Sequence, residues 1–124
     1  MRKVFIVSLL FLLLGCSRLS WLAEIYMVKA EKEFEKAHSL RIKKIPYEER
    51  LRYYRDACHF FLKAYDYDSR IFTLNRIYLA SESCLRIEDR ESEKKFRQFE
   101  EEYVKQHPKE AEYGEAGFLI GLEQ

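Results

Sequence analysis

The chain of 124 residues has the length of a single domain, and its 22 basic and 21 acidic side chains nearly cancel. This balance gives no electrostatic reason to expect nucleic acid, whose binding proteins usually carry a clustered basic surface, so no nucleic-acid partner is expected. Charged residues make up 35% and aromatic residues 15% of the chain, which is too much core-forming material for a disordered protein. Helix formers dominate and no long alternation of apolar and polar residues occurs, so the composition predicts an all-α fold.

The first fifteen residues follow the pattern of a secretory signal peptide. Arg2 and Lys3 give a positive start, and residues 4–14 are apolar except for Ser8. The apolar stretch ends at Arg18, short of the about 20 apolar residues that a membrane-spanning helix needs. An uncleaved signal anchor and a buried helix of a cytosolic protein are the alternatives.

The apolar run leads into the sequence Leu-Leu-Gly-Cys, which ends at Cys16 and resembles the lipobox of bacterial lipoproteins. The resemblance implies that residues 1–15 are removed and that the Cys16 thiol carries acyl chains which anchor the protein to a membrane. Residues 16–19 then form a lipidated tether, followed by a helical domain over residues 20–124. Ser17 resembles the sorting signal for the outer membrane, which implies a protein facing the periplasm. In a host with a single membrane, the protein lies on the outer face of the plasma membrane.

Four to five helices are predicted in the domain from apolar spacing and capping residues. They cover residues 20–41, 46–66, 70–87, 90–107 and, in a glycine-containing tail, 110–122. The candidate capping residues are Ser20, Asp68 or Ser69, and Asp89. Short turns imply that consecutive helices are antiparallel neighbours.

The second helix, residues 46–66, has the widest apolar surface. Two neighbouring stripes run along it, formed by Leu51, Tyr54, Cys58, Phe61 and Tyr65 and by Tyr53, Ala57, Phe60 and Ala64. Such a surface is typical of a helix that packs against two partners, so this helix is predicted to be central. The first helix has one stripe, formed by Ala23, Tyr26, Ala30, Phe34 and Ala37.

Cys58 and Cys84 lie on successive predicted helices. An exported protein can form disulfides. With the turn at Asp68 and Ser69, however, the two cysteines are offset by about 7 Å along the helix axes. Two buried free cysteines are therefore expected, and a bridge is the alternative.

Small and aromatic residues recur at one spacing, in Ala57, Phe61 and Ala64 and again in Ala30, Phe34 and Ala37. The spacing resembles the second helix of a tetratricopeptide repeat. The segment from Lys95 to Ala116 is similar to repeats of periplasmic tetratricopeptide proteins, which include the assembly lipoprotein of the β-barrel insertion machinery of the outer membrane. The resemblance implies a degenerate array of helical hairpins, whereas a plain four- or five-helix bundle is the alternative.

No motif of an enzyme is found. The three histidines stand alone on their predicted helices, and His59 points away from the adjacent Cys58 because neighbouring helical residues lie about 100° apart. Asp66 and Asp68 are interpreted as capping residues instead of calcium ligands. We therefore predict no catalytic residue, no metal site and no cofactor.

The nine tyrosines are the most unusual feature of the domain. Tyrosine and arginine are favoured anchors of protein interfaces, and several of them lie at the margins of the apolar stripes. The candidate protein-binding groove contains Tyr53, Arg55, Tyr65, Tyr67, Arg70 and Tyr78. The alternative is that most of these rings complete a small core.

The predicted function is that of a non-catalytic, lipid-anchored adaptor of the cell envelope. It binds another protein through a helix-lined groove, in an outer-membrane assembly or transport complex. The alternatives are a lipoprotein that binds a lipid or metabolite and a structural envelope lipoprotein.

Overall fold

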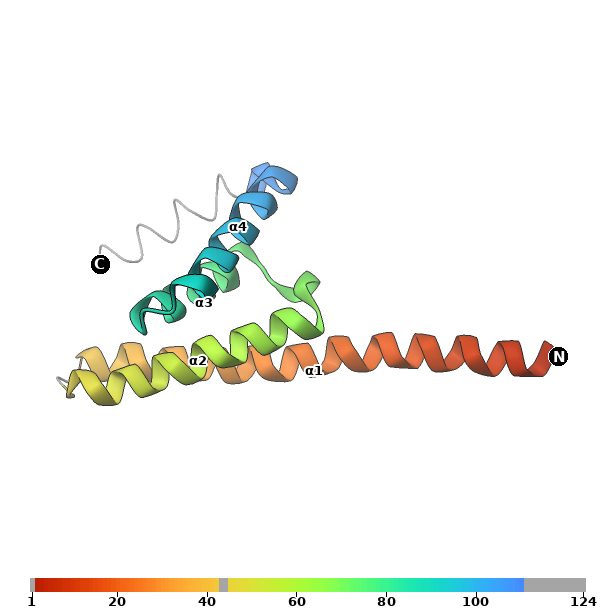
Figure 1. The fold of residues 1–124 in the computed structure, drawn as a ribbon, viewed down its shortest axis with the longest axis horizontal. Coiled ribbons are helices and arrows are strands. Elements are labelled where there is room, and N and C mark those ends of the chain that lie inside the picture. Colours follow the sequence, from red (N-terminus) through yellow and green to blue (C-terminus); the bar gives the residue numbers. More distant parts are fainter. Residues whose placement is uncertain (1, 43–44, 111–124) are drawn as a thin grey trace.

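The computed structural model describes residues 2–42 and 45–110, with the side chains of residues 19–39 and 45–110. All regular elements in this part of the chain are helices, which confirms the all-α class (Figure 1). They are α1 (Arg2–Ile42), α2 (Tyr47–Tyr67), the short 3₁₀ helix η1 (Ser69–Ile71), α3 (Leu74–Arg86) and α4 (Arg90–Gln106). The helix predicted over residues 110–122 falls, after its first residue, outside the described residues.

Helix α1 begins at Arg2, earlier than the predicted start at Ser20. The leader and the tether expected from the sequence lie within this one helix, because their leucines favour a helix and no proline interrupts them. The N-terminal part of α1 extends beyond the other helices (Figure 1). Ser20 therefore does not cap a helix, and that prediction is wrong. Its hydroxyl instead donates a hydrogen bond of 2.9 Å to Oδ2 of Asp68.

Helix α2 is the central helix, as predicted. It follows Pro46, and Glu48 and Glu49 in its first turn complement the helix dipole. It packs along α1 on one side and against α3 on another (Figure 1). Its buried residues all belong to the predicted stripes and are Tyr54, Ala57, Cys58, Phe61 and Ala64.

The turn after α2 is longer than predicted. Asp68 caps the short helix η1 by accepting a hydrogen bond from the backbone N–H of Arg70. Phe72 is then extended and buried in the core, and α3 begins only after Thr73, whose hydroxyl accepts from the N–H of Arg76. The predicted helix start at Arg70 is thus wrong, because burial of Phe72 and the Thr73 cap set a later start.

The connection between α3 and α4 is tight. Glu88 adopts a left-handed conformation with φ of 61°, a region that favours glycine. The N–H of Asp89 donates to the carbonyl of Cys84, and the N–H of Glu88 donates to the carbonyl of Leu85, each at 3.0 Å. This is the Schellman pattern of helix termination. Asp89 then caps α4, as predicted, by accepting from the N–H of Ser92.

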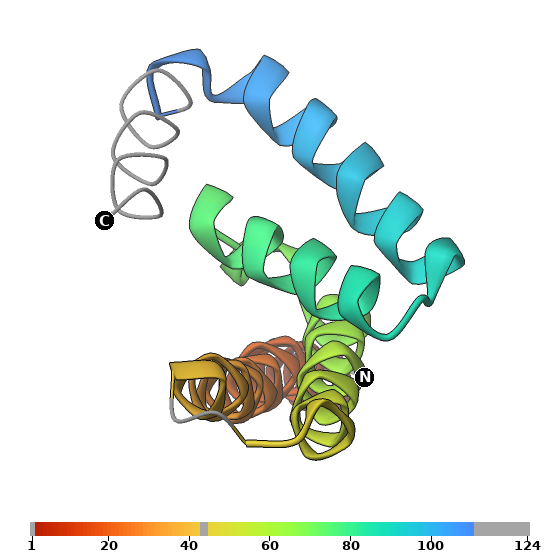
Figure 2. The same cartoon turned by 90° about the vertical axis from the view of Figure 1, so that its left-hand side faces the viewer.

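The helices form two layers. Helix α2 runs back along α1, and α3 and α4 lie together across that pair (Figure 2). Small side chains at the contacts let the helices approach closely. Six alanines are fully buried, namely Ala23, Ala30, Ala37, Ala57, Ala64 and Ala80. Every residue of the predicted α1 stripe is buried or half-buried. The prediction did not include Met27, which is also fully buried.

Candidate functional site

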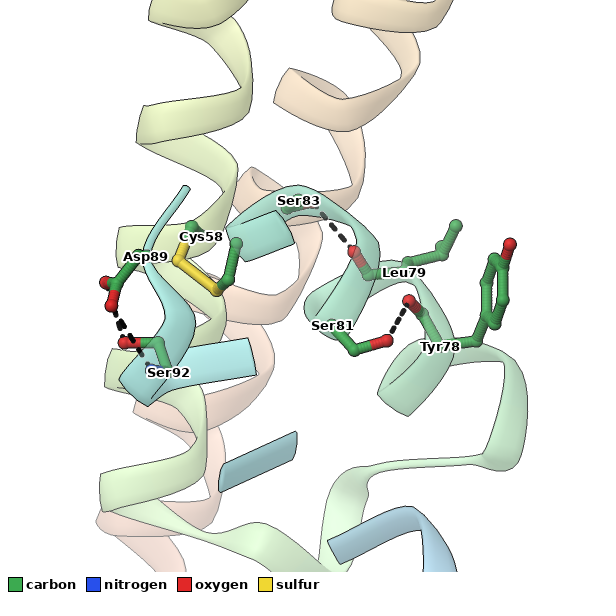
Figure 3. The surroundings of a disulfide bond; sticks show 8 residues. Cys58, Tyr78, Leu79, Ser81, Ser83, Asp89 and Ser92 are labelled. Carbon is green, nitrogen blue, oxygen red and sulfur yellow. Dashed lines mark hydrogen bonds between the residues drawn. A yellow bond between two sulfur atoms is a disulfide. The ribbon is translucent and has the colours of Figure 1, made fainter. Parts of the chain in front are cut away.

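Cys58 of α2 and Cys84 of α3 form a disulfide bond, with their Cα atoms 5.0 Å apart (Figure 3). The expectation of two free cysteines is wrong because it placed the turn at Asp68 and Ser69. The turn in fact extends to Thr73, so Cys58 lies nine residues before the end of α2 and Cys84 ten residues after the start of α3. The offset along the helix axes therefore falls from about 7 Å to about 1.5 Å.

The disulfide locks the central helix to the second layer from inside the core, since both cysteines are buried. Two serines of α3 are buried near it, and both satisfy their hydroxyls within the helix (Figure 3). Ser81 donates to the carbonyl of Tyr78 at 2.9 Å, and Ser83 donates to the carbonyl of Leu79 at 2.8 Å. The bridge thus lies in a packed structural region.

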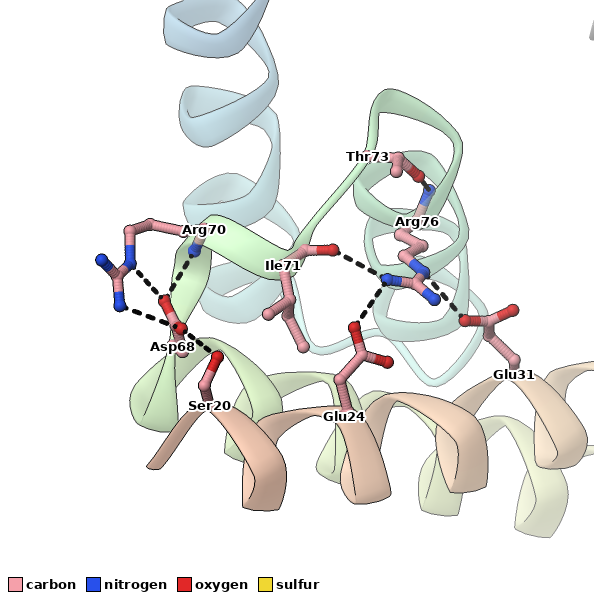
Figure 4. A network of polar contacts seen from close by, with 8 residues as sticks. All are labelled: Ser20, Glu24, Glu31, Asp68, Arg70, Ile71, Thr73 and Arg76. Carbon is pink, nitrogen blue, oxygen red and sulfur yellow. Dashed lines mark hydrogen bonds and ion pairs between the residues drawn. The ribbon is translucent and has the colours of Figure 1, made fainter. Parts of the chain in front are cut away.

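Arg76 of α3 joins the second layer to α1 (Figure 4). Its Nε donates to Glu31 at 3.0 Å, and its Nη1 donates to Glu24 at 3.4 Å and to the carbonyl of Ile71 at 2.8 Å. The two glutamates lie seven residues apart, on one face of α1. One planar guanidinium therefore fixes α3 at two points along α1 and holds the turn beside it.

Asp68 joins the end of α2 to α1. Its carboxylate accepts from Nε of Arg70 at 2.9 Å and from the Ser20 hydroxyl at 2.9 Å (Figure 4). Its side chain is only 7% exposed. The hydrogen bond from the Arg70 side chain, opposed by burial and helped by Ser20, lowers the pKa of Asp68 from 3.8 to about 2. The contact thus depends on an ionised carboxylate.

Tyr65, a candidate groove residue, belongs to an aromatic cluster between α2 and α4. Its ring meets those of Phe72, Phe96 and Phe99 edge-on, with centroids 6.1, 5.9 and 5.2 Å apart. The side chain of Lys95 also contacts this ring, with Nζ 4.5 Å from the ring centroid. This ring completes the core, as the alternative reading of the tyrosines expected.

Tyr67 and Tyr53 lie beside α1 instead. The ring of Tyr67 stacks on Tyr26 of α1, with centroids 5.5 Å apart. Nζ of Lys36, also on α1, lies 6.0 Å from the centroid of the Tyr53 ring. Both tyrosines are half-buried. They support the contact between the two long helices.

The other three candidates are spread over the fold. Arg55 is exposed on α2, Arg70 binds Asp68 on η1, and Tyr78 is half-buried on α3. Burial, with the charge of Glu82 next in size, raises the pKa of Tyr78. The described contacts do not gather the six candidates around one groove.

One exposed face of α2 carries two arginines and a histidine, called the basic row below, which the candidate set covered only in part. Arg52, Arg55 and His59 are all exposed, at the spacing of one helical face. None of these three residues belongs to the two predicted apolar stripes. An open depression of about 460 Å³ lies on α4, where Arg97, Glu100, Glu101, Val104 and Lys105 line it.

Exposed apolar side chains also lie on more than one side of α1, in the first turns whose side chains are described. Leu19 is 45%, Trp21 66% and Val28 47% exposed. Within residues 19–39 and 45–110, no helix is long and apolar enough to cross a membrane. The same side chains contain no group of three or more metal-binding residues placed to hold an ion.

The helices are thus held together by a buried disulfide and by the polar contacts of Arg76 and Asp68. The exposed row of α2 and the exposed apolar side chains of α1 remain accessible. No protein-family model, no curated protein and no solved structure matches the chain.

Proposed function

We propose that the protein is a non-catalytic, lipid-anchored adaptor of the cell envelope that binds another protein through its helical surface. The mature chain begins at Cys16, whose acyl chains hold it in the outer membrane, facing the periplasm. In a host with a single membrane it lies on the outer face of the plasma membrane. The partner belongs to an outer-membrane assembly or transport complex.

Two independent features support export and anchoring. The first is the lipobox-like sequence that ends at Cys16. The second is the disulfide between Cys58 and Cys84, because disulfides form and persist in oxidising compartments such as the periplasm and are rare in the cytosol. The disulfide joins residues far from the leader, so the two features are independent of each other.

The packing of the helices supports the adaptor role. The alanines at the repeated spacing, Ala30, Ala37, Ala57 and Ala64, are all fully buried at helix contacts. This is the use that tetratricopeptide-like hairpins make of small residues, and we propose that the two layers are degenerate antiparallel repeats of that kind. Stacked helical hairpins commonly serve as rigid surfaces for partners.

The exposed row of α2 is the proposed contact surface. Arg52, Arg55 and His59 lie on the face of α2 that turns away from its buried stripes, and Tyr53 lies beside them. Arginine and tyrosine supply much of the binding energy in protein interfaces. The observation that carries the proposal is this open row on a helix whose other faces are fixed by α1, α3 and the disulfide. Glu48 and Glu49, also exposed, lie one turn before Arg52, so acidic side chains of the partner are expected opposite Arg52 and Arg55 in particular.

The wide apolar arc of α2, which suggested a pocket for a lipid or metabolite, is filled by the protein itself. Tyr54, Ala57, Phe61 and Ala64 are buried in contacts with the neighbouring helices. The adaptor is therefore the better supported of the two functions.

The proposal is tested by crosslinking in intact cells, followed by purification from gently solubilised membranes. A single partner in stoichiometric amount is expected, and Arg55→Glu should release it because the change reverses charge in the basic row. Tyr65→Ala is unsuitable for this purpose because it disrupts the aromatic cluster.

The matched control is Lys94→Glu, an equal charge reversal at an exposed position of α4. This variant should keep the partner. Recovery of the protein alone in repeated experiments, or equal loss of the partner in both variants, would contradict the proposed surface.

A further inference from the structure

The first turns of α1 that are described with side chains expose large apolar groups on more than one side of the helix. Each residue of a helix turns the side chain by about 100°, so Leu19 and Trp21, two residues apart, point to nearly opposite sides of the axis. Both are exposed, at 45% and 66%. A groove on a protein partner contacts only one face of a helix. A bilayer that the helix enters end-on surrounds all of its faces. The arrangement therefore favours end-on contact.

Among the side chains of α1 that the structure describes, residues 19–39, the large exposed apolar ones lie no later than Val28. From there to Ser39 the exposed residues are polar or charged and include Lys29, Lys32, Glu35 and Lys36. The helix thus changes from an apolar end to a charged body over a few turns. Such a change is typical of a segment that crosses from the edge of a bilayer into water.

The spacing along α1 fits the headgroup region of a bilayer. Because α1 is continuous from Arg2 to Ile42, Leu19 and Trp21 lie about 4.5 and 7.5 Å along the axis from Cys16. The headgroup region of one leaflet is about 5–8 Å thick, taken from the difference between the whole bilayer and its hydrocarbon core. Acyl chains that lie in the hydrocarbon core would hold the Cys16 backbone at the boundary between that core and the headgroups. Both side chains then fall inside the headgroup layer, the depth that tryptophan favours.

We propose that Leu19 and Trp21 insert into the headgroup region of the membrane that holds the lipid anchor, so that the bilayer itself is the partner of this surface. This inference rests on the anchoring of Cys16 in the proposed function. Its consequence is that the domain stands on the membrane in a fixed orientation. The basic row of α2 is then presented at a defined height above the lipid.

The chain contains a single tryptophan, so its fluorescence reports on Trp21 alone. The mature lipidated protein is reconstituted into vesicles of phosphatidylcholine and phosphatidylglycerol, with and without brominated phosphatidylcholine. We expect a blue-shifted emission and loss of most of the intensity with the brominated lipid, because bromine quenches only at close range.

The matched control is the double variant Trp21→Phe, Tyr47→Trp. It moves the tryptophan to another exposed position, 53% against 66% for Trp21, at the start of α2 and thus at the end of the pair remote from the N-terminus of α1 (Figure 1). Its emission should resemble that of a water-exposed tryptophan and should not respond to bromine. Circular dichroism checks that both forms remain equally helical.

The outcomes separate the inference from the anchor. If the protein floats with the vesicles and its mass shows acylated Cys16 while Trp21 is unquenched, the inference is wrong and the anchor stands. A blue-shifted but unquenched Trp21 means a protein contact and also overturns the inference. If Cys16 carries no lipid and the protein does not float, the proposed anchoring fails and the inference fails with it.

Discussion

Ser20 and Asp68, 48 residues apart in the chain, are joined by a hydrogen bond of 2.9 Å that fixes the end of α2 to α1. The same carboxylate accepts two hydrogen bonds from the Arg70 side chain, at 2.9 and 3.2 Å. The second layer begins directly after this contact, at the turn that leads into α3. The position of the second layer relative to α1 therefore depends on an ionised aspartate.

This dependence predicts a loss of stability in acid. The pKa of Asp68 is lowered in the folded protein from 3.8 to about 2, so the unfolded state takes up the proton first as the pH falls. The contribution is complete above about pH 4 and disappears as the pH falls towards 2. Because Arg70 is 82% exposed, screening reduces it to on the order of 1 kcal/mol.

The measurement is urea unfolding of the wild type and Asp68→Asn between pH 5 and pH 2, a range set by the linkage of the pKa shift to stability. The difference between their free energies of unfolding should shrink as the pH falls. Ser20→Ala should raise the pKa of Asp68, observed by carboxyl NMR. A difference that stays constant with pH would count against the contact.

The disulfide between Cys58 and Cys84 should supply much of the stability of the second layer. It closes a loop with a sequence separation of 26. For a loop of this length the chain-entropy argument gives about 3.5 kcal/mol. The double variant Cys58→Ala, Cys84→Ala should lose that amount in denaturant unfolding.

Alkylation in denaturant, with and without reductant, provides the control. Unfolding exposes both buried cysteines, and a disulfide should still leave neither thiol free to react before reduction. Free thiols at both positions in protein taken from the envelope would contradict the disulfide and weaken the argument for export.

Arg76 should be more important for stability than an ordinary surface ion pair. Arg76→Met keeps the apolar stem but removes the contacts with Glu24, Glu31 and the carbonyl of Ile71. We expect a loss of about 1–2 kcal/mol in the free energy of unfolding. The matched control is Arg97→Met, which breaks an exposed pair with Glu93 inside α4 and should cost only about 0.3–0.5 kcal/mol. Equal losses in the two variants would refute the linking role.

Glu88 offers a stabilising change. Its φ of 61° lies in the left-handed region, where a Cβ atom costs about 1 kcal/mol and glycine costs nothing. Glu88→Gly should therefore raise the melting temperature, with a gain of about 0.5–1 kcal/mol. Lys94→Gly, inside exposed α4, is the control and should lose about 1 kcal/mol. A destabilised Glu88→Gly would mean that the Glu88 side chain itself stabilises the turn.

Local patterns in the sequence were sufficient for the helices with clear caps and stripes. Asp89 begins α4 as predicted, and the alanine stripe of α1 is buried. The start of α3 was not predictable in this way, because Phe72 leaves the helical path to join rings from α2 and α4 that are distant in sequence. The disulfide was missed for the same reason, since its geometry depends on the length of that turn.

The candidate site was less predictable than the fold. Tyrosines at the edge of an apolar stripe have the same spacing whether their rings pack in the core or bind a partner. Tyr65 contacts Phe96 and Phe99, which no local pattern links to it. Arg55, in contrast, belongs to neither predicted stripe of α2 and is exposed.

We propose that an exported helical domain is held in a membrane by acyl chains on Cys16. The intact mass of the protein, purified from membranes in mild detergent without reductant, tests this directly. We expect a chain that begins at Cys16 and carries a diacylglyceryl group, with Cys58 and Cys84 bridged. A soluble cytosolic form that retains residues 1–15 and has three free thiols would contradict it.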